Sequence, residues 1–293
     1  MPLEALPYVL LLGFLFGSTL VASRFGVAQF APSTYIGLRL SLASAACGLI
    51  YAIHPAYKWP TDARLWRRAT LLGVVGTAIP MTAIVTSLRY QSSGVTSILL
   101  TANPALTVLF AHYALKDERL TRRKVVGLVL ALGGALLLTL RGESGIPGVH
   151  EASPMGYGLV LAAMTLASGA TIYMRRYLAE YAALDVSTIR FLAAALTVLP
   201  LSALLLGLDF SRVDGRGYLV LGYAGLVGTF IGLLLAFYIV KRFGATSAAM
   251  TAYVIPLVAT VGGALLLGEQ ITPGMVAGMG IIVGGIALLQ MRA

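Results

Sequence analysis

Two prolines stand in the middle of long apolar stretches of the sequence, Pro104 in the first half and Pro256 in the second. A proline cannot donate a hydrogen bond inside a helix, so the carbonyls of Leu100 and Ala252, four residues earlier, lose their usual partners. Polar groups in apolar surroundings need partners, and a cavity that holds water or a bound solute would supply them. The alternative is that they hydrogen-bond across helices as packing contacts. The polar side chains beside the two prolines are Thr101, Asn103, Thr251 and Tyr253.

Two arginines also lie in apolar runs, Arg39 in residues 33–53 and Arg190 in residues 185–206. Each is about six residues, or roughly 9 Å, from the start of its run. A charged side chain at the centre of a bilayer costs at least about 3 kcal/mol, whereas near a helix end it can reach the membrane surface or bond terminal carbonyls. We therefore expect structural roles, in which both arginines hold helix ends or lipid phosphates. The alternative is that either one binds a substrate carboxylate.

The remaining polar residues do not form a catalytic or metal-binding pattern. Cys47 is the only cysteine, which excludes an internal disulfide and a cysteine-based metal site. All Asp and Glu residues fall at the ends of apolar runs or between them, so we expect no catalytic residue, no metal, no cofactor and no proton relay through an intramembrane carboxylate. Glu118 and Glu269 precede Thr121 and Thr272 in the pattern of a helix start, and we expect both glutamates to favour the positive end of the helix that follows.

The elements that carry these residues follow from composition. Of 293 residues, 58% are hydrophobic and 11% are charged, and the mean hydropathy is +0.89, whereas soluble domains carry about 25% charged residues. We therefore expect an all-α integral membrane protein with ten transmembrane helices. The apolar runs lie near residues 6–25, 33–53, 69–88, 93–115, 123–140, 155–177, 185–206, 217–239, 246–267 and 273–291.

The net charge of +10 is distributed unevenly among the connections between these runs. If the N-terminus and every second connection share one side of the membrane, that side holds fourteen Lys and Arg residues and the other side holds five. This asymmetry predicts that both termini are cytoplasmic. It also assigns the positive charge to topology and anionic lipid headgroups rather than to nucleic acid.

The sequence repeats itself weakly at an offset of 151 residues. Each repeat contains five apolar runs, an odd number, so the second copy enters the membrane from the opposite side. We therefore expect two inverted five-helix repeats, residues 1–142 and 154–293, joined by a linker at 143–153. The offset aligns Arg24 with Arg175, Arg39 with Arg190, Glu118 with Glu269, and Thr121 with Thr272.

The fifth and tenth runs carry small residues at four-residue spacing. Faces of this kind let two helices approach closely, and the motif does not tell whether the partner is internal or a second subunit. We expect these two helices to support the halves rather than to touch a substrate. The small residues are Gly127, Ala131 and Ala135 in the fifth run, and Gly274, Gly278, Gly280 and Gly284 in the tenth.

Several motifs resemble the tandem EamA units of the drug/metabolite transporter superfamily. They are "GLRLSLA" and "TIRFLAAAL" in the second helix of each half, "NPALTVLFAHYALKDERLT" and "IPLVATVGGALLLGEQIT" in the fourth, and "GLVLALGGALLL" and "GMGIIVGGIALL" in the fifth. The resemblance covers nearly the whole chain, which is similar to bacterial amino-acid and metabolite exporters. Thr101 and Asn103 depart from the pattern, because some aromatic amino-acid exporters have tyrosine and tryptophan at these positions.

The resemblance implies a central cavity between the third, fourth, sixth, eighth and ninth helices. An interfacial belt is the alternative for the aromatic residues of the eighth helix. Prolines at the interruptions supply candidate hinges at Pro80, Pro104 and Pro256. The candidate substrate-binding residues are Thr77, Pro80, Ile84, Thr101, Asn103, Thr165, Ser168, Tyr223, Phe230, Tyr238, Thr251 and Tyr253.

Together these features predict a secondary carrier in a bacterial inner membrane that exports small amphipathic metabolites by alternating access, with neutral or aromatic amino acids favoured. No ATP-binding loop of the Walker type is present, which disfavours direct ATP drive. The missing intramembrane carboxylates favour facilitated movement down a concentration gradient. The expected partners are a small-molecule substrate and the lipid bilayer, with a monomer favoured over a homodimer. The alternatives are export of another metabolite or a drug, and an intramembrane enzyme, which would need a catalytic cluster that the sequence does not show.

Overall fold

The structure is a computed structural model that describes residues 3–114, 120–149 and 153–290. These residues form helices and no strands, and ten helical spans are long and apolar enough to cross a membrane. The number of spans and the helical class agree with the sequence prediction. The third span begins at Ala63, six residues before the expected start at 69, and the eighth is also longer than expected, at Gly215–Phe243.

Six spans are single helices, and four are divided. The single helices are α1 (Leu6–Gly26), which continues from the short turn η1 (Leu3–Ala5), α2 (Pro32–Ile53), α7 (Arg122–Leu140), α8 (Pro154–Tyr177), α9 (Ala183–Leu206) and α14 (Pro273–Gln290). The third span comprises α3 (Ala63–Gly73), the π-helical segment η2 (Val74–Ala78) and α4 (Ile79–Ser87). The eighth comprises α10 (Gly215–Gly222), the π-helical segment η3 (Tyr223–Ile231) and α11 (Gly232–Phe243). The fourth contains α5 (Ser93–Thr101) and α6 (Asn103–Ala114), and the ninth contains α12 (Ala245–Ala249) and α13 (Thr251–Leu267).

Side-chain caps define where several helices begin. The hydroxyls of Thr121 and Thr272 accept hydrogen bonds from the backbone N–H groups of Lys124 (3.3 Å) and Met275 (3.2 Å), so both predicted threonine caps are confirmed. Asp62 caps α3 by accepting the backbone N–H groups of residues 64 and 65. These bonds stabilise the ionised carboxylate and hold the pKa of Asp62 below its usual value.

The expected role of Glu269 at the start of its own following helix is wrong. Its carboxylate lies instead at the N-terminus of α5, where it accepts hydrogen bonds from the Ser93 backbone N–H (2.9 Å) and hydroxyl (2.7 Å). It also accepts the Gly94 backbone N–H (3.4 Å) and lies 3.7 Å from Nε of Arg24. The positive end of α5 and its unpaired amides attract the carboxylate more strongly than the threonine-capped start of α14. Glu118 lies outside the described residues.

Both proline-containing spans are interrupted, but not in the same way. In the fourth span the helix breaks at Ala102, directly before the helix that carries Pro104. In the ninth span the break lies at Met250, whereas Pro256 lies inside the continuous helix α13. Here α1 packs closely along α13, because a Cβ atom added at Gly17 would lie 2.8 Å from the Ile255 carbonyl oxygen. The close contact with α1 therefore lies directly beside Pro256.

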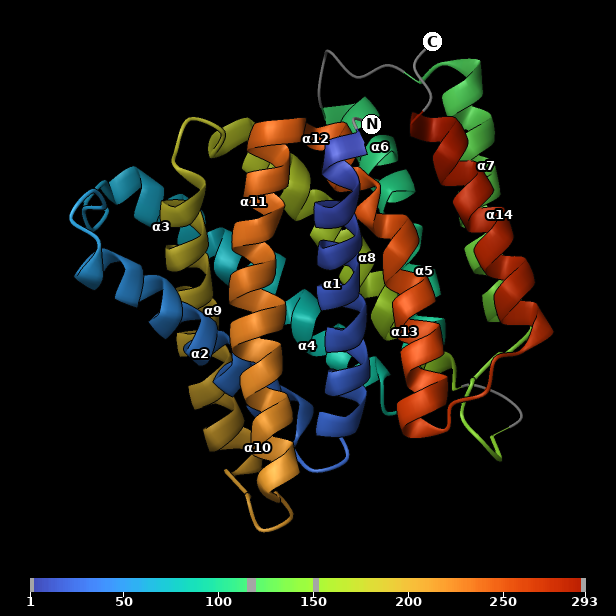
Figure 1. Cartoon of the computed structure of the whole chain (residues 1–293), viewed down its shortest axis with the longest axis horizontal. Coiled ribbons are helices and arrows are strands. Elements are labelled where there is room, and N and C mark those ends of the chain that lie inside the picture. Colours follow the sequence, from blue (N-terminus) through green and yellow to red (C-terminus); the bar gives the residue numbers. More distant parts are fainter. Residues whose placement is uncertain (1–2, 115–119, 150–152, 291–293) are drawn as a thin grey trace.

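The helices pair across the two halves of the chain. The main pairs are α2 with α9, α7 with α14, α1 with α13, and α4 with α8. Figure 1 shows both termini on the same side of the molecule, as an even number of crossings requires. The pair α7 and α14 lies at one end of the molecule in this view.

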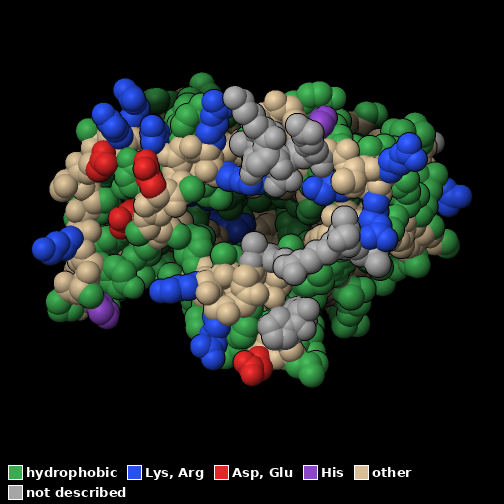
Figure 2. Space-filling model, turned by 90° about the horizontal axis from the view of Figure 1, so that it is seen from above, with side chains coloured by type: hydrophobic (Ala, Val, Ile, Leu, Met, Phe, Trp, Pro, Cys, Tyr) green, Lys and Arg blue, Asp and Glu red, His purple; other side chains and the backbone are tan. Residues whose placement is uncertain are grey.

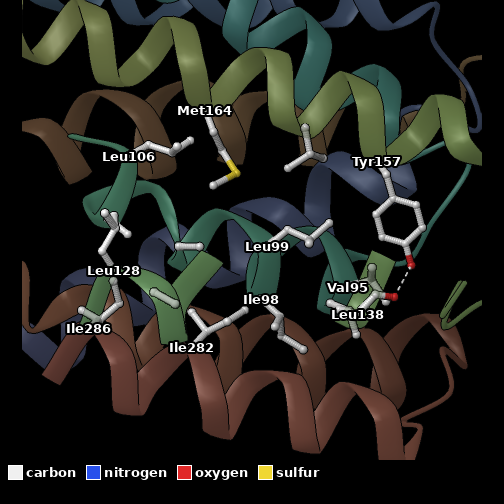
Figure 3. Packing of buried hydrophobic residues seen from close by; sticks show 14 of the residues in the cluster. Val95, Ile98, Leu99, Leu106, Leu128, Leu138, Tyr157, Met164, Ile282 and Ile286 are labelled. Carbon is white, nitrogen blue, oxygen red and sulfur yellow. Dashed lines mark hydrogen bonds between the residues drawn. The ribbon is translucent and has the colours of Figure 1, made fainter. Parts of the chain in front are cut away.

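One apolar cluster joins α5 and α6 to the α7–α14 pair on one side and to α8 on the other. Figure 3 shows Ile98 and Leu99 of α5 between Ile282 of α14 and the side chains of α8. The Tyr157 hydroxyl of α8 donates to the Leu138 carbonyl at 3.2 Å, which pairs a buried polar group at the edge of this cluster. This cluster fixes α5, and α5 in turn carries part of the cavity described below.

Glycines bring α7 and α14 into backbone contact. A Cβ atom at Gly285 would lie 2.5 Å from the Ala131 backbone nitrogen, and one at Gly127 would lie 2.7 Å from the Gly285 carbonyl oxygen. The partner of this small-residue face is therefore internal. Gly280 and Gly284 lie on the open side of α14 and meet no atom within 4 Å, so they do not belong to the contact face that the spacing predicted.

We predict that Gly285→Ala lowers the midpoint of thermal unfolding of the detergent-solubilised protein, with a loss of about 1–3 kcal/mol, because the new methyl group overlaps backbone atoms of α7. Gly284→Ala is the matched control at the next position, where the added methyl group meets open space. That variant should be neutral or slightly more stable, because alanine favours helix over glycine by about 1 kcal/mol. Equal stability of the two variants would contradict the backbone contact.

Candidate functional site

A cavity of about 230 Å³ lies between α1, α2, α4, α5 and α13. Its lining is mostly apolar and includes one cation and several hydroxyl groups. Figure 2 shows that the face carrying both termini is hollowed near its centre, with Lys and Arg side chains around the hollow. The apolar lining residues are Phe16, Leu20, Met81, Ile84, Val85, Leu100, Ala252 and Ile255, and the polar ones are Thr19, Ser23, Arg39, Ser97 and Thr101.

Hydroxyl groups in the lining donate their protons to backbone carbonyls of their own helices. Thr19 donates to the Leu15 carbonyl (2.6 Å), Ser97 to the Gly94 carbonyl (2.7 Å), and Thr101 to the Ser97 carbonyl (2.9 Å). A hydroxyl has one proton and two lone pairs, so each of these oxygens retains acceptor capacity. The cavity wall therefore offers hydrogen-bond acceptors to a donor group.

The two residues whose carbonyls lose a helical hydrogen bond to the prolines both line this cavity. Leu100 and Ala252 come from different halves of the chain, and both line it. Neither carbonyl can receive the usual helical bond, because Pro104 and Pro256 have no backbone N–H. Both prolines thus mark the central cavity, even though the two helix breaks are not equivalent.

Among the described residues that line the cavity, Arg39 is the only charged one, and it is 9% exposed. Its Nε donates to the Thr229 hydroxyl at 2.8 Å, and its Nη1 donates to the Ser23 hydroxyl at 3.3 Å. These partners are threonine and serine side chains rather than the helix-end carbonyls or lipid phosphates that we expected. In the described part of the chain, the two ion pairs join Arg24 to Glu269 and Arg68 to Glu180, and neither involves Arg39.

Arg190 occupies the corresponding place in the second half. Its Nε donates to the Thr77 hydroxyl at 3.0 Å, and its guanidinium lies 5.4 Å from the ring centre of Phe191. Thr77 belongs to η2 and Thr229 to η3, and each threonine hydroxyl also reaches back five residues, to the carbonyls of Leu72 (3.4 Å) and Ala224 (2.8 Å). Each arginine thus holds a π-helical segment of the other half. Arg190 is not among the residues that line the central cavity.

The structure brings only part of the predicted site together. Ile84 and Thr101 line the central cavity. Asn103 lies outside that lining, because its Oδ1 accepts the Ser168 hydroxyl at 3.0 Å in the contact between α6 and α8. The two polar side chains satisfy each other there, as the packing alternative predicted.

Two other candidates face lateral grooves. Thr165 lines a groove of about 270 Å³ with residues of α3 and α8, and Tyr223 lines one of about 430 Å³ between α1, α13 and the eighth span. The Tyr223 hydroxyl lies 2.7 Å from the Ser18 hydroxyl. Exposed apolar side chains border these grooves, among them Leu71 (50% exposed) and Phe14 (52% exposed), so we assign both grooves to the outer, lipid-facing side of the bundle.

The remaining candidates also lie outside the cavity lining. Pro80 and Thr251 are buried, and the Thr251 hydroxyl has no hydrogen-bond partner in the described part of the chain. Phe230 packs against the apolar cluster around α2. Tyr238 is 42% exposed, and its ring centre lies 5.2 Å from that of Tyr8 with the rings tilted by 50°. The Tyr253 hydroxyl donates to Oε1 of Gln290 at 3.0 Å.

Residues of α1 are the main part of the lining that the sequence argument missed. Phe16, Thr19 and Ser23 lie at three- and four-residue spacing, which places them on one face of a helix. The nearby Gly13 and Gly17 contact α13 directly. That small-residue spacing was a signal that α1 approaches the ninth span and so reaches the centre of the bundle.

The chain is similar in sequence and in fold to known proteins. Residues 3–140 and 154–291 each match the EamA-like transporter family. The chain belongs to this family. Inner membrane transporter YedA of Escherichia coli, an uncharacterized protein, is 25% identical over 94% of this chain and 87% of its own length. A probable terminal-alkyne amino-acid exporter of Streptantibioticus cattleyicolor is 26% identical over 94% and 89%. A solved crystal structure with a TM-score of 0.66 and 19% identity, covering 96% of this chain and 95% of its own, shares the fold. The protein is therefore a multi-pass membrane transporter.

We predict that a thiol introduced at Ile84 reacts with a small water-soluble methanethiosulfonate reagent, because it faces the cavity. The measurement uses a Cys47→Ala background, which removes the buried native thiol. Ser168→Cys is the comparison, since it tests a residue that the sequence predicted in the cavity but the structure buries between α6 and α8. It should react at least about tenfold more slowly in folded protein and equally fast after denaturation. Equal rates in folded protein would contradict the assigned cavity.

Proposed function

We propose that this EamA-family transporter is a secondary carrier that exports small amphipathic metabolites, with neutral and aromatic amino acids as the favoured class. The observation that carries the proposal is the chemistry of the central cavity: apolar walls, acceptor hydroxyls, one arginine and no carboxylate in the lining. A zwitterion with an apolar side chain is complementary to each of these three kinds of group. The Streptantibioticus cattleyicolor relative, which is named as a probable amino-acid exporter, supports the same class.

The size and charge of the cavity favour a metabolite over a cationic drug. Its volume of about 230 Å³ is below the roughly 300–1,000 Å³ of pockets for drug-sized ligands. A cationic drug would favour a buried carboxylate, whereas the only charged group in this lining is Arg39. An intramembrane enzyme is disfavoured because its catalytic groups would have to meet in this same lining.

Reciprocal contacts support two inverted repeats, with boundaries at 1–142 and 154–293 and a linker at 143–153. The first span packs on the ninth through α1 and α13, and the sixth packs on the fourth through α8 and α6, as exchange of the two halves requires. The bonds from Arg39 to Thr229 and from Arg190 to Thr77 are exchanged in the same way. Inverted repeats of this kind suit alternating access, in which groups of helices rock about a central site. Pro80, Pro104 and Pro256 are the proposed hinges.

The conformation fits a carrier that is closed on one side. Glu269, Arg24 and Ser93 form a polar cluster that ties the end of α1 to the start of α5. The cluster lies about one turn beyond Ser97 of the cavity lining. We assign this cluster to the closed outer side and the hollow in Figure 2 to the open side. The open side carries both termini, which we assign to the cytoplasm of a bacterium on the basis of the lysine and arginine distribution.

Two further observations bear on the driving force for transport and on the oligomeric state. No carboxylate of the described residues lines the cavity, which favours facilitated movement down the substrate gradient over exchange with protons. The small-residue faces of α7 and α14 are occupied by each other, which favours a monomer over a homodimer built on these helices.

The test is flux into proteoliposomes that contain the purified protein. We predict uptake of labelled phenylalanine, threonine and methionine above that of empty liposomes, with phenylalanine and methionine favoured because the cavity wall is mostly apolar. An imposed proton gradient should leave the initial rates unchanged within about twofold. Proton-driven accumulation would contradict facilitated movement, and absence of flux for all three amino acids would contradict the substrate class.

A further inference from the structure

We infer that Arg39 is the anchor for a single carboxylate of the transported molecule, so that the substrate class is small apolar compounds with one carboxylate. This inference rests on the proposed function and names the group that recognises the substrate. It begins from a buried charge that lacks a counter-ion. Arg39 is 9% exposed, its bonds run to two neutral hydroxyls, and no ion pair in the described part of the chain includes it.

A buried cation is costly unless a charge or a polar cavity compensates it. Arg39 lies in the wall of the central cavity, where an entering anion would meet it directly. A carboxylate bound there would replace the missing counter-ion, so the free protein would be built to favour an anionic ligand. The single arginine in the lining matches one carboxylate, whereas a phosphate ester or a dicarboxylate would need further cations.

The hydrogen-bond inventory of Arg39 leaves room for such a ligand. A guanidinium has five N–H groups in a planar fork. Nε bonds Thr229 and one N–H of Nη1 bonds Ser23. Among the described residues, no hydrogen bond or ion pair involves the second N–H of Nη1 or either N–H of Nη2. A neighbouring pair of these donors fits the two oxygens of a carboxylate.

Arg190 serves as an internal control for this argument. It makes the same bond to a π-helical threonine, but it packs on Phe191 and is absent from the cavity lining. Holding a π-helical segment therefore does not require an arginine to face a cavity. The position of Arg39 in the lining is an additional property, and ligand binding gives it a physical reason.

Hydroxyl groups in the same lining suit an ammonium group on the same ligand. The hydroxyl oxygens of Thr19 and Thr101 retain acceptor capacity, because their protons are donated to helix carbonyls. Leu100 and Ala252 add carbonyls that lack the helical bond from a proline. An α-amino acid thus finds donors for its carboxylate at Arg39 and acceptors for its ammonium group on α1 and α5.

The test is equilibrium binding by calorimetry with purified protein in detergent, using two acid–amide pairs: L-phenylalanine with L-phenylalaninamide, and 3-phenylpropionate with 3-phenylpropionamide. Wild-type protein should bind each acid roughly tenfold or more tightly than its amide, as expected for a hydrogen-bonded charge pair. Arg39→Gln should reduce that preference to less than about twofold. Arg39→Lys, which keeps the charge but not the planar fork, should retain an intermediate preference.

The matched control is Arg190→Gln, which removes the equivalent arginine–threonine bond and should leave the acid–amide preference unchanged. If Arg39→Gln weakens acid and amide by the same factor, or if Arg190→Gln removes the preference equally, Arg39 is structural only and the inference is overturned. Should Arg39→Gln fail to elute as a single folded species, an undiminished preference in Arg39→Lys would overturn the inferred bidentate contact. Binding of 3-phenylpropionate without L-phenylalanine would support the anchor but contradict the amino-acid proposal, and binding of neither acid would contradict both.

Discussion

The bond between Arg39 and Thr229 is the contact on which the centre of this transporter depends. A helical bundle in lipid has no water to solvate a charge or an unpaired backbone group, so each polar group must find a partner inside the protein or in a cavity. The Thr229 hydroxyl accepts a hydrogen bond from the Arg39 guanidinium and donates its own proton to the carbonyl of Ala224, five residues earlier. Both threonine and carbonyl belong to the π-helical segment of the eighth span. The same bond joins α2 to the other half of the chain and leaves the remaining guanidinium donors beside the cavity.

This arrangement connects the cavity to the polar cluster of Glu269, Arg24 and Ser93 over a short distance. Ser23 bonds Arg39, and the next residue, Arg24, lies 3.7 Å from the Glu269 carboxylate that caps α5. The cavity wall and the polar cluster therefore share the C-terminal part of α1. In the carrier that we propose, a change at Arg39 on ligand binding would pass through α1 to the contacts that hold α1 and α5 together. The apolar cluster around α5 and the close α7–α14 contact provide the rigid support against which such a movement would act.

Much of the fold could be predicted from the sequence, because length and hydropathy determine membrane spans directly. The caps at Thr121 and Thr272 were also predictable, since a helix cap depends on the residue types at the start of the helix. The site was predicted less well. Polar residues in a span can either line a cavity or bond another helix. Ser168 of α8 donates a hydrogen bond to Asn103 of α6, so these two residues bond across helices. The partner of Glu269 lies on a helix distant in sequence, and the threonines of the π-helical segments bond arginines of the opposite half. Neither contact could be predicted from local sequence.

The most direct test of the account is an experimental structure of the protein bound to L-phenylalanine. We predict density for the ligand in the central cavity, with its carboxylate oxygens about 3 Å from the Arg39 guanidinium nitrogens and its ring against the apolar wall formed by Phe16 and Met81. Ligand density confined to a lateral groove, such as the one lined by Tyr223, or a carboxylate directed away from Arg39, would contradict the central claim.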